Sequence, residues 1–193
     1  MEQRVPTVQS LEPQRRMAAD VRGYVGRSRL RVSHRRLHHC PRSPARCRGK
    51  KGGSEDQAIG RSRGGLSTKI HLAVRGLGCP VRLILTPGQK GDALQAGPLI
   101  EGLPADIVMA DTAYDADHFR LAIANKGALA VIPNNPSRSR KHPLDNHLYA
   151  QRHLVECCFS KLKQFRRVAT RYEKTARNYL AVVTIAAIAL WIR

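Results

Sequence analysis

The chain is short of acidic residues and of long apolar runs, and both shortages narrow the class of protein. Only 14 Asp and Glu oppose 34 Lys and Arg among 193 residues, which gives a formal net charge of +20. Such a charge indicates a polyanionic partner, most often nucleic acid. The longest apolar run, residues 179–192 with Thr184 inside it, is shorter than the about 20 residues that span a bilayer. No N-terminal stretch resembles a signal peptide. We therefore expect no membrane partner.

Motifs for nucleotides, disulfides and zinc are missing as well. The glycine-rich segments 50–53 and 60–65 match neither a P-loop nor a dinucleotide fingerprint, which argues against a nucleotide cofactor. Five irregularly spaced cysteines do not make a disulfide framework and fit a reducing cytoplasm. The spacing of His38, His39, Cys40 and Cys47 fits no standard zinc motif.

Lysine is absent from the first quarter of the chain. Residues 1–48 hold twelve Arg, three acidic residues and little apolar periodicity, whereas residues 49–193 hold nine Lys and a regular apolar pattern. We therefore divide the chain into an arginine-rich leader, residues 1–48, and a core, residues 49–193. Two explanations of the leader stay open. It is an arm that binds nucleic acid, or it is a disordered product of an out-of-frame translation.

The apolar pattern of the core predicts strands that alternate with helices. Strands are expected at 69–75, 81–86, 107–110 and 129–132, the first two joined as a hairpin by the turn at 76–80. Helices are expected at 92–103, 115–126, 145–165 and 175–191, and Asp92 is the expected N-cap of the first. This order predicts a mixed α/β sheet covered by helices.

Two acidic residues are candidates for chemistry. Asp111 follows the predicted strand 107–110, and ligands of open α/β sheets gather at the carboxyl ends of strands. The alternative is an ordinary carboxylate that ends a strand or caps a helix. Glu156 lies beside a helical stripe of apolar residues and one turn after Arg152. The alternative there is a solvated ladder of ion pairs.

A dense basic run follows Glu156. It contains Lys161, Lys163, Arg166, Arg167 and Arg171, with Phe165 and Tyr172 between them. Such a run suits contacts with nucleic-acid phosphates, although a solvated helix face is the plain alternative.

Several ordered segments together resemble the catalytic domain of insertion-sequence DDE transposases of the IS-five group. The matching segments are 55–71, 85–89, 110–115 and 131–133, followed by the signature Tyr149-x2-Arg152-x3-Glu156-x6-Lys163. The resemblance covers residues 49–193. It implies a ribonuclease-H-like fold, a mixed sheet with flanking helices, in a bacterial protein that works in the cytoplasm and on the nucleoid when bound to DNA.

The resemblance also implies the site and its partners. Asp111 and Glu156 would be the second and third of three carboxylates that hold two Mg²⁺ (or Mn²⁺) ions for strand cleavage and transfer. Tyr149, Arg152 and Lys163 would support Glu156 and contact DNA, together with Lys161, Arg166 and Arg167. The partners would be the element ends and target DNA. A homodimer is left open.

The first carboxylate of the family is missing. Its usual segment, Asp-Ser-Thr followed by Val-Arg-Ala-His, is replaced by residues 34–49. Codons for residues 34–50 that are read one nucleotide later can spell that segment, with the missing Asp on the codon of Arg36. We therefore hypothesise that a frameshift near residues 49–51 joined an out-of-frame leader to an incomplete core. The central first strand is then missing or replaced, with residues 29–32 as a weak candidate for its place between otherwise unpaired edges.

Three functions follow from these observations. The first is a DDE transposase fragment, an enzyme by family whose catalysis is defective. The second is a non-catalytic DNA-binding protein derived from a transposase, and the third is a basic RNA-binding protein. Metal-dependent nicking of DNA separates the first from the second, whereas the third predicts no effect of changing Asp111 or Glu156.

Overall fold

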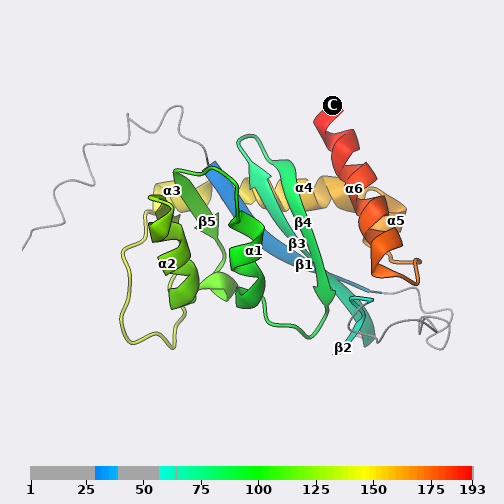
Figure 1. The fold of residues 1–193 in the computed structure, drawn as a ribbon, viewed down its shortest axis with the longest axis horizontal. Helices are drawn as coiled ribbons and strands as arrows, with labels where there is room; N and C mark the ends of the chain where they lie inside the picture. Colours follow the sequence, from blue (N-terminus) through cyan, green and yellow to red (C-terminus); the bar gives the residue numbers. More distant parts are fainter. Residues whose placement is uncertain (1–28, 39–56, 64, 193) are drawn as a thin grey trace, which may run out of the picture.

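A mixed sheet forms the middle layer of the described residues, which are 29–38, 57–63 and 65–192 of this computed structural model (Figure 1). Its strands are β1 (Arg29–His38), β2 (Gly60–Ser62), β3 (Gly65–Arg75), β4 (Cys79–Pro87), β5 (Ile107–Ala110) and β6 (Leu129–Val131). The central strand is β1, which pairs with β3 antiparallel on one side and with β5 parallel on the other. Outside them, β4 and β2 pair with β3, and β6 pairs with β5.

This order of strands confirms the ribonuclease-H-like fold class. The hairpin β3–β4 lies antiparallel beside β1, and β5 and β6 continue the sheet in parallel. The central strand, expected to be missing or replaced, is replaced by Arg29–His38. The unpaired edges of β3 and β5 that its loss implies do not arise. The domain boundary at residue 49 stays a prediction, because β1 lies within the predicted leader while residues 1–28 and 39–56 lie outside the described residues.

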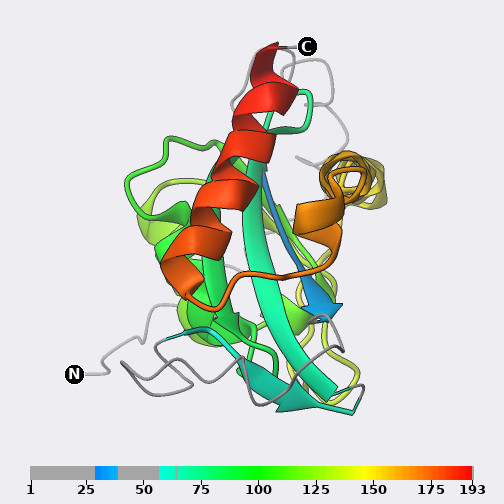
Figure 2. The ribbon, with the colours of Figure 1, turned by 90° about the vertical axis from the view of Figure 1, so that its right-hand side faces the viewer.

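Helices cover both faces of the sheet. On one face lie α1 (Ala96–Ile100) and α2 (Asp117–Asn125), and on the other lie α3 (Asn146–Ala150), α4 (His153–Lys163), α5 (Arg166–Ala169) and α6 (Ala176–Ile192). Figure 2 shows the sheet nearly edge-on, with green α1–α2 and orange α4–α5 on opposite sides. The four predicted helices and four predicted strands of the core thus correspond to elements here, and β2 and α5 were not predicted.

The side chains of β1 alternate between these two faces, as period two requires. Leu30 and Val32 are buried in the core beneath α1 and α2, where each stabilises the fold by about 1.5–3 kcal/mol. Arg31 points to the opposite face and is only 2% exposed. Its Nε donates to the carbonyl oxygen of Gln151 at 2.9 Å, and its Nη1 donates to that of Gly76 at 2.7 Å. Burial lowers the pKa of Arg31, and the nearby charge of Arg29 lowers it further.

The predicted helix 145–165 is divided into α3 and α4 at residues 151–152. Backbone amides there bond three residues back, as in Arg152 N to Tyr149 O at 2.9 Å and Val155 N to Arg152 O at 3.0 Å. This tighter turn changes the direction of the chain between α3 and α4. Within it, the Gln151 carbonyl oxygen accepts a hydrogen bond from Arg31 of β1. The first predicted helix also differs. It begins as a 3-10 turn, η3 (Ala93–Gln95), and Asp92 does not cap it with its side chain.

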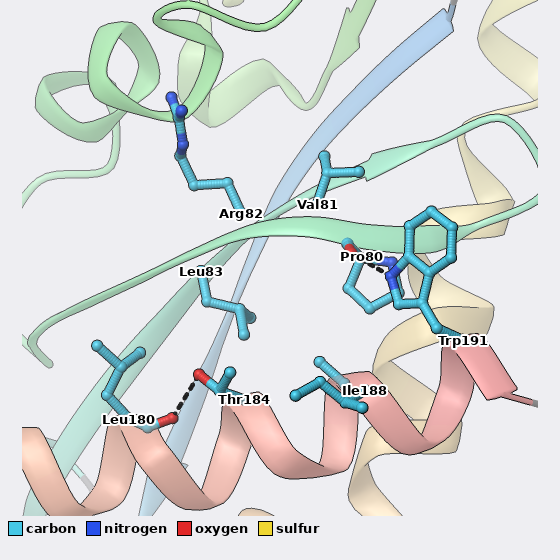
Figure 3. A pocket seen from close by; sticks show the side chains of 9 residues that line it. Pro80, Val81, Arg82, Leu83, Leu180, Thr184, Ile188 and Trp191 are labelled. Atoms are coloured by element: carbon cyan, nitrogen blue, oxygen red, sulfur yellow. Dashed lines mark hydrogen bonds between the residues drawn. The ribbon is translucent and has the colours of Figure 1, made fainter.

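The last helix, α6, packs along the edge strand β4 (Figure 3). Leu83 of β4 points toward Leu180, Thr184 and Ile188 of the helix, and Trp191 Nε1 donates to the Pro80 carbonyl oxygen at 2.7 Å. The apolar run 179–192 is only partly buried in this helix, because Ile185 and Ile192 are exposed. In the part of the chain that the structure describes, no helix is long and apolar enough to cross a membrane.

Candidate active site

Asp111 stands where β5 ends, as the sequence predicts. Its Oδ1 accepts a hydrogen bond from Thr112 N at 2.8 Å and so caps the 3-10 turn η4 (Thr112–Tyr114). Its Oδ2 lies 3.7 Å from Arg152 Nη1, and 39% of the side chain is exposed. Asp111 therefore caps η4, as the alternative interpretation of this residue predicted. Its second oxygen, Oδ2, is still available to a functional site.

Glu156 enters the same region from the first turn of α4. The apolar stripe predicted beside it is buried, with Val155, Phe159 and Leu162 in the core. Glu156 sits at the border of that stripe, and its Oε1 accepts from Arg152 Nη2 at 2.9 Å. This pair is one helical turn apart, as the ion-pair alternative predicts.

Arg152 brings the two acids together. Its guanidinium contacts both Asp111 and Glu156, and it lies over the Tyr149 ring at 5.4 Å from the ring centroid. Burial opposes the charge of Arg152, but attraction by Tyr149, Asp111 and Glu156 outweighs it and raises its pKa. For Tyr149, in contrast, burial is the main cause that raises the pKa. Three signature residues thus gather around Asp111.

Arg35 of β1 is the residue that sequence reasoning missed. Its Nη2 lies 3.8 Å from Glu156 Oε1, on the same face of β1 as Arg31. The frame comparison assigned the missing Asp to the codon of Arg36, but neighbouring residues of a strand point to opposite faces. Once residues 29–38 are known to form a strand, this alternation assigns position 35 to the face of α4. Position 36, to which the shifted frame assigns the missing Asp, therefore lies on the opposite face of β1, and the β1 side chain that contacts Glu156 is the guanidinium of Arg35.

The basic residues proposed for DNA lie farther along. Lys161, Lys163, Arg166 and Arg167 are all exposed, at the C-terminal end of α4 and on α5. Five to seven residues of helix separate the two lysines from Glu156, which is about 8–10 Å of axial rise. Arg167 contacts Glu173 at 3.4 Å. These four residues form a surface beside the carboxylates. Among the described residues, Lys163 of the signature makes no ion pair or hydrogen bond with Asp111 or Glu156.

Arg171 does not belong to that surface, which corrects the sequence interpretation. It is 1% exposed. Its guanidinium donates to Thr68 Oγ1 at 2.7 Å and to the Gln57 carbonyl oxygen at 2.8 Å, and it lies over the Tyr179 ring. Arg171 therefore ties the segment before β2 to the start of α6, and it is not available for phosphate.

A second polar cluster lies on the other side of β1. Lys69 Nζ contacts Asp92 Oδ1 at 2.7 Å, and His34 Nε2 lies 3.4 Å from Asp92 Oδ2. His71 is buried beside them, within 3.0 Å of Tyr114 Oη and 2.8 Å of Thr86 Oγ1. Apart from the alternation of β3, no sequence pattern predicted this cluster. Asp92 is paired inside it and does not join Asp111 and Glu156.

The charges around Asp111 do not fit a divalent-metal site. Metals of this kind need several oxygen ligands, and carboxylates supply them. Within the described ranges, no group of three or more His, Cys, Asp or Glu residues could hold a metal ion. Two carboxylates are present, and the cations Arg152 and Arg35 already contact them. The residues present therefore disagree with the metal that the resemblance implies.

Comparisons with known proteins agree on the family. The family model described as a transposase DDE domain matches residues 31–192. A protein of Brucella ovis, described as a transposase for insertion sequence element IS6501, is 45% identical over 130 residues, which are 66% of this chain and 100% of that protein. A protein of Burkholderia cepacia, described as a transposase for IS402, is 30% identical over 121 residues, or 56% of this chain and 55% of that protein.

Among solved structures, the catalytic core domain of BIV integrase is similar at 16% identity and a TM-score of 0.46, over 84% of this chain and 82% of that one. The family assignment rests on the sequence matches, which span most of the chain. This chain belongs to the DDE transposases of insertion sequences.

Proposed function

We propose that this chain is an insertion-sequence transposase that binds DNA but has lost strand cleavage and transfer. The observation that carries the proposal is the guanidinium of Arg35, which contacts Glu156 from the central strand, on which the resemblance expects the first carboxylate. Three carboxylates could share two divalent ions, whereas two carboxylates already paired with two guanidiniums lack both the ligands and the uncompensated negative charge.

DNA binding is supported by charge and exposure. The net charge is +20, and Lys161, Lys163, Arg166 and Arg167 offer four exposed cations on neighbouring helices. Such side chains contact phosphates without reading sequence. We assign these four residues to the DNA backbone, and Tyr149 and Arg152 to the support of Glu156. The partner is the DNA of the bacterial nucleoid, and the homodimer stays a prediction.

The division of the chain is part of the same proposal. Residues 1–48 are an out-of-frame leader and residues 49–193 an incomplete core, joined by a frameshift. The polar, arginine-rich sequence of β1 supports this, because a central strand of an α/β sheet is ordinarily apolar on both faces. Sequencing the gene around codons 25–60 tests it. The frameshift hypothesis fails if no neighbouring frame encodes the Asp-Ser-Thr segment.

A second function is favoured by the surface that remains. The exposed basic residues would let the chain occupy DNA without cutting it, so it would act as a DNA-binding competitor of an intact transposase. Adding this chain to a cleavage reaction of an intact relative should then lower the rate in proportion to the DNA occupied. An unchanged rate at saturating occupancy would remove this function.

Nicking of supercoiled plasmid tests the loss of catalysis. With 5 mM Mg²⁺ or Mn²⁺ as chosen conditions, we expect no more nicked product than with EDTA, while filter binding shows that the plasmid is retained. Glu156→Gln serves as the matched control, because it removes a carboxylate without adding a charge of opposite sign. Metal-dependent nicking by the unaltered chain that Glu156→Gln abolishes would show that the chain is an active enzyme.

A further inference from the structure

Arg35 has donors to spare. Its only ion pair in the described part of the chain is with Glu156 at 3.8 Å, which is too long for a hydrogen bond. The side chain is 44% exposed, and that of Glu156 is 42% exposed. Ion pairs between exposed groups contribute only about 0–1 kcal/mol. The guanidinium can therefore turn to another anion at little cost.

The charges at this place cancel without any metal. Asp111 and Glu156 carry two negative charges, and Arg152 and Arg35 carry two positive ones. In a site of three carboxylates, divalent ions must first neutralise the acids before a phosphate can approach, because like charges repel. In this chain, the guanidiniums of Arg152 and Arg35 already neutralise the two acids. A phosphate meets a neutral site on a strongly basic molecule.

Only one of the two guanidiniums is available to a ligand. Arg152 is held from three sides, by Asp111, Glu156 and the Tyr149 ring, and its side chain is 17% exposed. Arg35 is held from one side, by Glu156, and its side chain is 44% exposed. A planar guanidinium presents two parallel N–H groups that match two phosphate oxygens.

We propose that the cluster of Asp111, Arg152, Glu156 and Arg35 binds a DNA phosphodiester without a divalent metal, with Arg35 as the residue that contacts the phosphate. This inference rests on the proposed function, since it requires that the chain binds DNA. It assigns a metal-independent role to a site whose family use is metal-dependent. The binding is of DNA backbone and carries no base specificity.

Fluorescence anisotropy with a 30-base-pair duplex tests the proposal. Affinity is measured in EDTA and in Mg²⁺ at equal ionic strength for the unaltered chain, Arg35→Gln and Arg75→Gln. Arg75 is the matched control, because it is exposed, equally charged and five positions along β3 from Ile70, the partner of Arg35. In EDTA, Arg35→Gln should bind about tenfold more weakly with a salt slope lower by about one, whereas Arg75→Gln should stay within about twofold.

A second variant tests the replacement of metal by a guanidinium. Arg35→Asp places a third carboxylate beside Glu156, so DNA binding in EDTA should fall below that of Arg35→Gln, and Mg²⁺ should restore part of it. The same ion should raise the melting temperature of Arg35→Asp and leave that of the unaltered chain unchanged.

Each outcome separates the two proposals. If the unaltered chain binds no DNA in either buffer, the proposed function itself is wrong. If it binds DNA but Arg35→Gln and Arg75→Gln weaken it equally, only bulk charge acts and the assignment to Arg35 is overturned. Loss of the unaltered chain's binding in EDTA would also overturn it, because the site would then need its metal.

Discussion

At the scale of single residues, His71 is a buried group whose surroundings change its pKa in the mildly acidic range. It is fully buried on β3 between Tyr114 and Thr86, with the His34 ring 5.8 Å away and the Lys69–Asp92 pair nearby. Burial is the main cause that lowers its pKa from 6.5 to about 4, and the charge of His34 adds to it. Burial also lowers the pKa of His34.

These shifts predict a loss of stability in mild acid. The folded state binds fewer protons than the unfolded state between pH 6.5 and about 4, so stability is complete above this window and falls as the pH falls through it. For His71 alone the loss is on the order of 3 kcal/mol. Urea unfolding at pH 7, 5.5 and 4.5 measures it.

His71→Gln is the control for this window. The variant keeps a polar side chain between Tyr114 and Thr86 but cannot titrate, so its stability should fall less from pH 7 to 4.5. The pKa of Asp115 is lowered below 3.8 by Asn135, Arg120 and Arg138 despite the opposing effect of burial, so its loss comes at lower pH. Equal losses in both proteins would mean that His71 is not the cause.

At the scale of elements, the turn between β3 and β4 docks on α4. Gly76 and Gly78 both have positive φ, 51° and 91°. A methyl group on Gly78 would lie 3.1 Å from the Leu154 carbonyl oxygen of α4, whereas one on Gly76 would meet nothing within 4 Å. The Gly76 carbonyl also accepts from Arg31 of β1. The turn therefore links β1, the hairpin and α4.

Two alanine variants separate backbone strain from this docking. Gly76→Ala should lower the free energy of unfolding by about 1 kcal/mol, the usual cost of a left-handed residue with a side chain. Gly78→Ala should lower it by about 2–3 kcal/mol, because a steric contact with α4 adds to a more strained φ. Chemical denaturation of both variants measures the difference, and equal losses would show that α4 yields without cost.

At the scale of the whole molecule, positive charge dominates long-range behaviour. The exposed basic residues of α4 and α5 concentrate part of this charge on the surface next to the cluster of Asp111, Arg152, Glu156 and Arg35. If they contact DNA, replacing all four by Gln should lower the slope of log K against log salt by up to about four. Duplex affinity between 50 and 300 mM NaCl, chosen conditions, measures this slope. The replaced residues are Lys161, Lys163, Arg166 and Arg167.

A charge-matched control distinguishes this surface from net charge. A second variant loses four other exposed cations, and its slope should change less than that of the α4–α5 variant. Both should fold, because exposed substitutions usually change stability by about 0.5 kcal/mol or less. Equal slopes would mean that DNA contacts are spread over the surface. The control residues are Arg61, Arg63, Arg75 and Lys126.

The sequence by itself determined most of the elements and half of the site. Alternation and helical spacing are local, and they predicted β3, β4 and α6 to within a few residues, and α3 and α4 as one continuous helix. The same spacing put Arg152 one turn from Glu156, where their ion pair forms. Asp111 was found because a short apolar run predicts where a strand ends.

Only the tertiary structure decided the rest, because the deciding contacts join distant residues. The hairpin and β5 need a strand between them, and Arg29–His38 takes that place, whereas the polar sequence offered only residues 29–32 as a weak candidate for it. Arg31 can be buried there because carbonyls 45 and 120 residues away accept its N–H groups. In the same way, Arg35 reaches Glu156 across 121 residues of sequence. No local pattern carries such pairings, since each depends on where the whole sheet brings its strands.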